Sequence, residues 1–162
     1  MLEIQKLAYF LQVSGEPLRL AFVKAKYGPY AETLHHVLQR IEGHFIRGYG
    51  DRNRQASVDV VPQAMERAEN TLAESYPDTL RRAERVKSVI EGFETPYGLE
   101  LLSSVHWIMS EDSEARESFP KALSGVRAWN RRKEEIFPDK HLAVAWERLH
   151  SFGDLNQPFE GT

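Results

Sequence analysis

The stretch that decides the fold is TPYGLELLSSVHWIMS at residues 95–110, the most apolar segment of the chain. Thr95 and Pro96 stand where a helix would begin, because a threonine side chain can cap a helix and proline is tolerated at its first position. The leucine, valine and isoleucine content that follows is typical of a buried helix. The segment therefore predicts the central helix of the core.

Helical patterns continue on both sides of this segment, each with proline or glycine near an end. One of them starts at Pro29 and ends at Gly43. An acidic link over residues 111–118 separates the central helix from the last two. Apolar stripes predict further helices over residues 2–13, 29–42, 62–74, 79–93, 121–136 and 139–152.

Between residues 18 and 61 the pattern is partly that of β-structure. Residues 18–27 alternate only in part, so a strand and a short helix both remain open there. Residues 44–49 and 57–61 flank turn residues, which predicts a hairpin. The expected fold is mainly α (α+β): a single helical domain of about six to seven helices with a small β-hairpin or sheet near residues 18–61.

The composition excludes several classes of protein. A chain of 162 residues suits one domain and can bury a core without metals or disulfides. There are no cysteines, which excludes a disulfide framework and a cysteine nucleophile. The net charge of −3 is not the basic footprint of a nucleic-acid-binding protein. No apolar run reaches the roughly 20 residues of a membrane span, and no signal peptide is visible, so we expect a cytoplasmic protein.

The candidate contact region is the stretch YGPYAETLHHVLQRIEGHFIRGYGD at residues 27–51. Tyr30 and Tyr49 lie at glycine or proline breaks in this stretch, and Tyr97 lies at a similar break further on. Loops at such breaks are often exposed, and tyrosine is enriched in protein interfaces. These tyrosines are the best physical indication of a binding surface.

Catalytic and metal-binding patterns are weak in this sequence. His35 and His36 are adjacent, so on a helix they project about 100° apart and rarely share one ion. Glu42 with His44, and Glu94 with Glu100, could act as acid and base, but each is more simply explained by structure. The run from Arg47 to Arg54 could grip a phosphate, although a solvated hairpin turn explains it as well.

Several motifs, taken together and in chain order, resemble the C-terminal domain of the DarG antitoxin. They are KLAYFLQ at 6–12, KYGPYAETLHHVL at 26–38, EGHFIRGYGD at 42–51, GFETPYGLELLSSVHW at 92–107 and AWNRRK at 128–133. The opening helix and the Tyr-Gly-Pro sequence also resemble, more loosely, the Panacea antitoxin domain. The DarG-like resemblance covers nearly the whole chain.

The resemblance implies one part of a two-part protein. DarG-type proteins join an N-terminal macrodomain, which removes ADP-ribose from DNA, to a C-terminal domain that binds the toxin DarT. DarT is an ADP-ribosyltransferase that modifies single-stranded DNA using NAD. Residues 1–162 would form a single toxin-binding domain, with the macrodomain absent from this chain and fused to it in the full-length protein. On this basis we expect no enzymatic activity, no catalytic residue, no cofactor and no metal.

The expected partner is a DarT-like toxin, with no direct nucleic-acid contact and no membrane. Inhibition would follow either from imitation of single-stranded DNA in the toxin's groove or from a contact that locks the toxin outside it. The residues predicted to bind the partner are Tyr30, Glu42, His44, Tyr49, Asp51, Glu94, Tyr97 and Glu100.

Two alternatives remain open from the sequence. One is a nucleic-acid-binding module that uses the loop from Arg47 to Arg54, which would show steeply salt-dependent DNA binding. The other is a hydrolase that uses Glu42 with His44, which would require both side chains to converge in a deep pocket.

Overall fold

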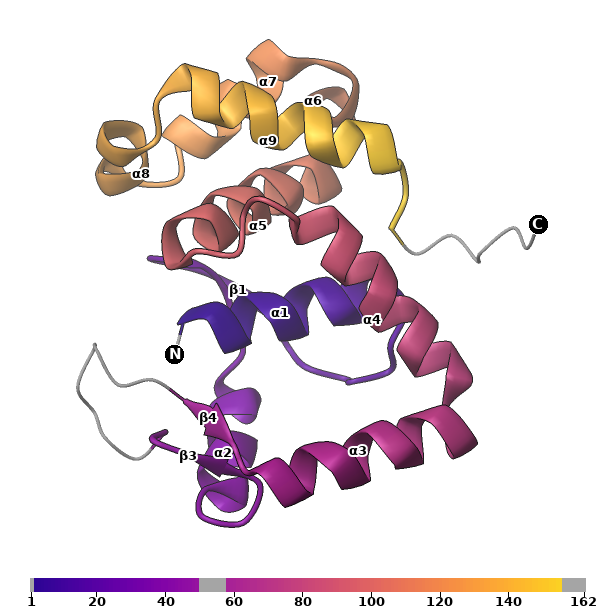
Figure 1. Ribbon diagram of the computed structural model, residues 1–162. Helices are drawn as coiled ribbons and strands as arrows, with labels where there is room; N and C mark the ends of the chain where they lie inside the picture. The colour runs from indigo at the N-terminus through magenta and orange to yellow at the C-terminus, as the bar shows by residue number, and fades with distance from the viewer. Residues whose placement is uncertain (1, 50–57, 156–162) are drawn as a thin grey trace.

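The computed structural model describes residues 2–49 and 58–155 and is mainly helical (Figure 1), which confirms the predicted fold class. The helices of the described residues are α1 (Leu2–Val13), α2 (Glu32–Ile41), α3 (Pro62–Ser75), α4 (Pro77–Ile90), α5 (Pro96–Glu111), α6 (Ser113–Glu117), α7 (Phe119–Arg127), α8 (Arg131–Ile136) and α9 (Asp139–Phe152). The strands are β1 (Val23–Ala25), β2 (Gly28–Tyr30), β3 (Ile46–Arg47) and β4 (Asp59–Val60).

The predicted central helix, α5, lies in the middle of the molecule. In Figure 1 it separates helices α6 to α9 from helices α1 and α4, and it packs on α1, α9, α7, α6 and β2. Leu102 and Val105 on α5 are almost completely buried. The Thr95 hydroxyl accepts a hydrogen bond of 3.0 Å from the backbone N–H of Gly98, so the predicted cap is confirmed.

The core is built mostly around α5. Each large apolar side chain that is removed from water there stabilises the fold by roughly 1.5–3 kcal/mol. The most completely buried members are Phe10, Val89, Leu99, Leu102, Val105, Val126, Phe137, Leu142 and Leu149. A smaller second cluster forms under α2 and β3 from Ala31, Leu34, Leu38, Ile46 and Tyr49.

Both small sheets are antiparallel pairs. β1 pairs with β2, with Val23 opposite Tyr30, and β3 pairs with β4, with Ile46 opposite Val60. The second pair confirms the predicted hairpin, although its turn lies outside the described residues. In the first pair, the strand reading of residues 18–27 is confirmed only for its last part, since β1 begins at Val23.

The prediction that a helix starts at Pro29 is wrong. Pro29 lies in β2, and α2 begins at Glu32. Side chains of α1 hold this segment extended: Lys6 Nζ donates to the Pro29 carbonyl over 2.6 Å, and the Gln5 amide bonds both backbone groups of Ala31. Tertiary contacts therefore override the local helix signal of proline.

The predicted helix over residues 121–136 is divided in two. α7 ends at Arg127, and the Asn130 side chain accepts from the N–H of Lys133 over 2.9 Å, which starts α8. The expected acidic link is itself helical, because the Asp112 carboxylate accepts from the N–H of Glu114 and begins α6. Short polar side chains compete with the helical backbone in this way and favour the ends of helices.

Helix α3 is attached differently from the others. It runs along the lower edge of the molecule in Figure 1 and packs on α4. Ala64 is its one buried residue in the described structure, and Met65 is 52% exposed. In residues 2–49 and 58–155 no helix is long and apolar enough to cross a membrane.

Substitution of Gly98 by alanine should destabilise the fold by about 2–3 kcal/mol. A Cβ atom at this position would lie 2.6 Å from the Phe93 carbonyl oxygen and 2.8 Å from the Phe93 Cα, so backbone would have to shift. Urea unfolding followed by circular dichroism measures the loss.

The matched control is Ser88→Ala on the exposed side of α4, where the change should stay within about 0.5 kcal/mol. Equal stability of Gly98→Ala and wild type would show that the close approach of Gly98 to Phe93 is not needed.

Candidate partner-binding site

A buried ionic cluster joins three helices beneath the candidate contact region. Glu100 on α5 is 4% exposed, and its carboxylate accepts from Lys133 Nζ at 2.8 Å and from two nitrogens of Arg132 at 2.5 and 3.2 Å. Lys133 is fully buried, with its ammonium 4.9 Å from the Trp129 ring centroid. Burial lowers the pKa of Lys133 although Glu100 acts in the opposite direction.

Lys6 supplies a third cation from α1. It is 1% exposed, and burial together with the charge of Lys133 lowers its pKa to about 8, while Glu100 partly offsets this effect. Gly28 lies against it: a Cβ on Gly28 would lie 3.3 Å from Lys6 Cε and 3.3 Å from the Ser103 hydroxyl. Glycine at this position, with a φ of +98°, lets the β1–β2 turn approach Lys6.

Glu100 was predicted to bind the partner, but its carboxylate is already engaged inside the protein. Glu42 is in a similar position: its two oxygens accept from the N–H groups of Gly48 and Tyr49, each at 3.0 Å. His44, next to it in sequence, is exposed. Glu42 and His44 therefore play different parts, with Glu42 fixing the turn that leads to Tyr49.

Tyr30 and Tyr49 share one cavity of about 340 Å³, which we call the tyrosine pocket. It lies between α1, the β1–β2 turn and the start of α2. Tyr49 is 5% exposed, and its hydroxyl bonds His35 Nδ1 at 2.6 Å. Burial and Glu32 raise the pKa of Tyr30 to about 12. The pocket is lined by Leu2, Gln5, Lys6, Ala25, Lys26, Tyr27, Gly28, Tyr30, His35 and Tyr49.

Tyr97 and Glu94 lie at the start of α5, in a separate group. Tyr97 is 39% exposed, and its hydroxyl bonds His141 Nδ1 at 2.8 Å. Glu94 is exposed and precedes the Thr95 cap. Neither residue lines the tyrosine pocket. Asp51 and most of the loop from Arg47 to Arg54 lie outside the described residues.

An apolar groove of about 470 Å³ runs between α1 and α4. Leu7 and Leu18 line it and are 39% and 37% exposed. Phe45, on the corner after α2, does not line this groove but is also exposed, at 46%. Exposed apolar side chains that lie close together are typical of surfaces that bind other proteins.

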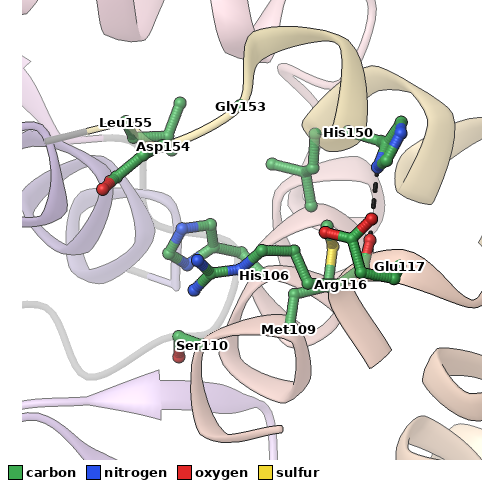
Figure 2. A pocket seen from close by; sticks show the side chains of 10 residues that line it. His106, Met109, Ser110, Arg116, Glu117, His150, Gly153, Asp154 and Leu155 are labelled. Atoms are coloured by element: carbon green, nitrogen blue, oxygen red, sulfur yellow. Dashed lines mark hydrogen bonds between the residues drawn. The ribbon is translucent and has the colours of Figure 1, made fainter. Parts of the chain in front are cut away.

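A smaller cavity of about 140 Å³ lies beside α5 and α9 (Figure 2). His106 and Arg116 point toward one another in it, and His150 Nδ1 lies 3.2 Å from the Arg116 carbonyl oxygen. His106 Nδ1 also bonds the Tyr9 hydroxyl at 2.7 Å. Burial lowers the pKa of His106 to about 4, so this histidine is neutral at pH 7.

Within residues 2–49 and 58–155, no group of three histidine, aspartate or glutamate side chains is placed to hold a metal ion. His35 is half-buried in the tyrosine pocket, and His36 is exposed beside Glu32 at 3.8 Å. The two adjacent histidines therefore have different surroundings, although their ring centroids are only 5.7 Å apart.

Comparison with known proteins identifies relatives that match nearly the whole chain. A DNA ADP-ribosyl glycohydrolase of Thermus aquaticus is 46% identical over 154 residues, which cover 95% of this chain and 42% of that protein. DNA ADP-ribosyl glycohydrolases of Mycobacterium bovis and Mycobacterium tuberculosis are each 37% identical over 155 residues, 91% of this chain and 43% of theirs. The chain thus spans less than half the length of these relatives. No family model matches the sequence.

These relatives correct one prediction. The prediction that this chain is not an enzyme is wrong, because proteins 37–46% identical over most of the chain carry the name of an enzyme, a glycohydrolase. That prediction rested only on the resemblance to the C-terminal, toxin-binding domain of DarG. The predicted resemblance to proteins of DNA ADP-ribosylation is confirmed, because these relatives are named DNA ADP-ribosyl glycohydrolases.

Sequence reasoning missed the residues that organise the site. Lys6 was read as part of an ordinary helix, and Tyr27 was not among the residues predicted to bind. One signal for Lys6 was available, because it lies in the run LEIQKLAYFL between the apolar positions Ile4 and Tyr9. The pairing of Glu100 with Arg132 and Lys133 joins positions more than thirty residues apart, and no local pattern shows it.

Replacing Glu100 by glutamine should destabilise the fold on the order of 3 kcal/mol, because buried cations lose their counter-charge. Thermal and urea unfolding measure the change. The control is Glu135→Gln, which breaks the exposed pair with Arg131 and should cost less than about 1 kcal/mol. A similar loss in both variants would contradict the special role of Glu100.

His106 should make stability fall as the pH drops from about 6.5 to about 4. In this window the unfolded chain binds a proton that the folded protein excludes, so the free energy of unfolding decreases by about 3 kcal/mol. Urea unfolding at a series of pH values measures the slope. His106→Gln should flatten it, whereas His44→Gln, at an exposed position, should retain the slope of wild type.

Proposed function

We propose that this chain is the toxin-binding segment of a protein of the DNA ADP-ribosyl glycohydrolase type. It binds a DarT-like DNA ADP-ribosyltransferase and neutralises it by direct protein–protein contact. The same full-length protein acts on ADP-ribosylated DNA, as the name of the relatives states for them.

One observation carries this proposal. The likeness to the relatives covers 95% of this chain but only 42% of the Thermus aquaticus protein, as expected for one functional segment of a longer protein. The motifs at residues 26–38, 42–51 and 92–107 are those that resemble the C-terminal, toxin-binding part of DarG.

The surface of the described residues supports contact with another protein. Phe45 and Tyr97 are exposed, as are Leu7 and Leu18 of the apolar groove, and the tyrosine pocket lies beside α1. Aromatic side chains in pockets are the usual centres of binding energy in protein interfaces.

Fewer of the predicted carboxylates are available to imitate the phosphates of DNA than the sequence suggested. Among the described carboxylates predicted to bind the toxin, Glu42 and Glu100 are engaged internally, and Glu94 is exposed. Binding outside the toxin's DNA groove is therefore the simpler mechanism of inhibition. Substitution of Glu94 can distinguish it from imitation of DNA.

Titration calorimetry of this chain into a catalytically inactive DarT-like toxin tests the proposal. We expect saturable binding, with a negative heat-capacity change because apolar surface is buried. Repeating the titration with the toxin's single-stranded DNA shows whether the two compete. Absence of binding by a folded chain would overturn the proposal.

Glu94→Lys separates the two mechanisms. If the chain imitates DNA, this change should weaken binding about tenfold and reduce competition with DNA; if it binds outside the groove, affinity should stay within about twofold. The matched control is Glu147→Lys on the exposed side of α9.

A further inference from the structure

We infer that the tyrosine pocket receives an aromatic side chain of the protein partner, carried on a segment with carboxylates next to it. This inference rests on the proposed function, because it names the part of the partner that the site binds. It follows from the size, the walls, the rigidity and the charge of the pocket.

The pocket is large enough to hold an aromatic side chain. Ligand pockets are typically about 300–1,000 Å³, and the tyrosine pocket, at about 340 Å³, is at the lower end of that range. Its walls combine the rings of Tyr27, Tyr30, Tyr49 and His35 with aliphatic Leu2. Aromatic rings pack well against such walls in edge-to-face and offset geometries.

Three of the polar side chains that line the pocket are already engaged. The Gln5 amide is engaged with both backbone groups of Ala31, Lys6 Nζ with the Pro29 carbonyl, and the Tyr49 hydroxyl with His35. A nucleobase needs hydrogen bonds at its edges, and the Gln5, Lys6 and Tyr49 side chains are not available to make them. A phenyl or indole ring does not have this requirement.

The walls are fixed before a ligand arrives. Glu42 holds the backbone of Tyr49, and Gln5 and Lys6 hold the strand of Tyr30 against α1. Tyr27 is bracketed by Arg132 at 4.6 Å and Lys26 at 5.3 Å from its ring centroid. Little conformational freedom is lost on binding, which favours affinity.

The charge beside Tyr27 selects an acidic neighbour for the ring. Arg132, Lys133 and Lys6 surround the single carboxylate of Glu100, and exposed Lys26 adds to this excess of positive charge. Glu32, which does not line the pocket, interacts with Tyr30. A cationic ligand would be repelled at the lysine side, whereas a carboxylate next to the ring would be attracted there.

The experiment fills the pocket and reverses its rim charge. Ala25→Trp adds a ring inside the pocket, and the strand tolerates tryptophan because the Ala25 contact with Trp129 uses its backbone carbonyl. Lys26→Glu changes an exposed position and leaves the core intact. Arg67→Glu, on the exposed side of α3, is the matched charge control.

Affinity for the inactive DarT-like toxin is measured for each variant by calorimetry at two salt concentrations, after circular dichroism shows that the variant is folded. Ala25→Trp should weaken binding at least about tenfold. Lys26→Glu should weaken it several-fold at low salt and much less at high salt. Arg67→Glu should bind like wild type.

Three results would contradict the inference. Wild-type affinity in both Ala25→Trp and Lys26→Glu would overturn the role of the pocket and leave the proposed function standing. Failure of the wild-type chain to bind would overturn both. Binding of a short oligothymidylate that Ala25→Trp abolishes would show that the pocket holds a nucleobase, contrary to the choice of a protein segment.

Discussion

The carboxylate of Glu100 is one buried anion among three cations, and most of the structure depends on where it lies. Through Arg132 and Lys133 it joins α5 to α8, and through the nearby Lys6 it reaches α1 and β2. A buried pair of this kind adds little net stability compared with an apolar core of the same shape. The ionic cluster instead favours one arrangement of the helices, because a different packing would leave a buried charge without a partner.

The apolar pattern was sufficient to predict the main helices. The run from Leu99 to Met109 predicted the central helix, and Thr95 was found where the sequence placed a cap. Pro29 shows the limit of such reasoning. Its local signal favours the start of a helix, but the side chains of Lys6 and Gln5, more than twenty positions earlier, bind the same segment in an extended form.

The sequence predicted the region of the candidate site, but not which of its carboxylates are engaged inside the protein. The tyrosines at glycine and proline breaks pointed to the region of Tyr30 and Tyr49, and the structure brings these two into one cavity. The carboxylates were harder to judge, because a glutamate near the end of a helix, as Glu42 and Glu100 are, is ordinarily solvated. Whether Glu42 and Glu100 face water is decided by backbone N–H groups and cations whose positions follow from tertiary structure.

Helix α3 has few apolar contacts with the rest of the protein, which affects local unfolding. It packs on α4, buries Ala64 and leaves most of its surface in water, so little apolar contact is lost when it separates from the rest. Units of this kind exchange their amide hydrogens through local opening, at a free energy well below that of global unfolding. The protein therefore contains two levels of stability, with α5 and its neighbours protected for as long as the fold persists and α3 exchanging far sooner.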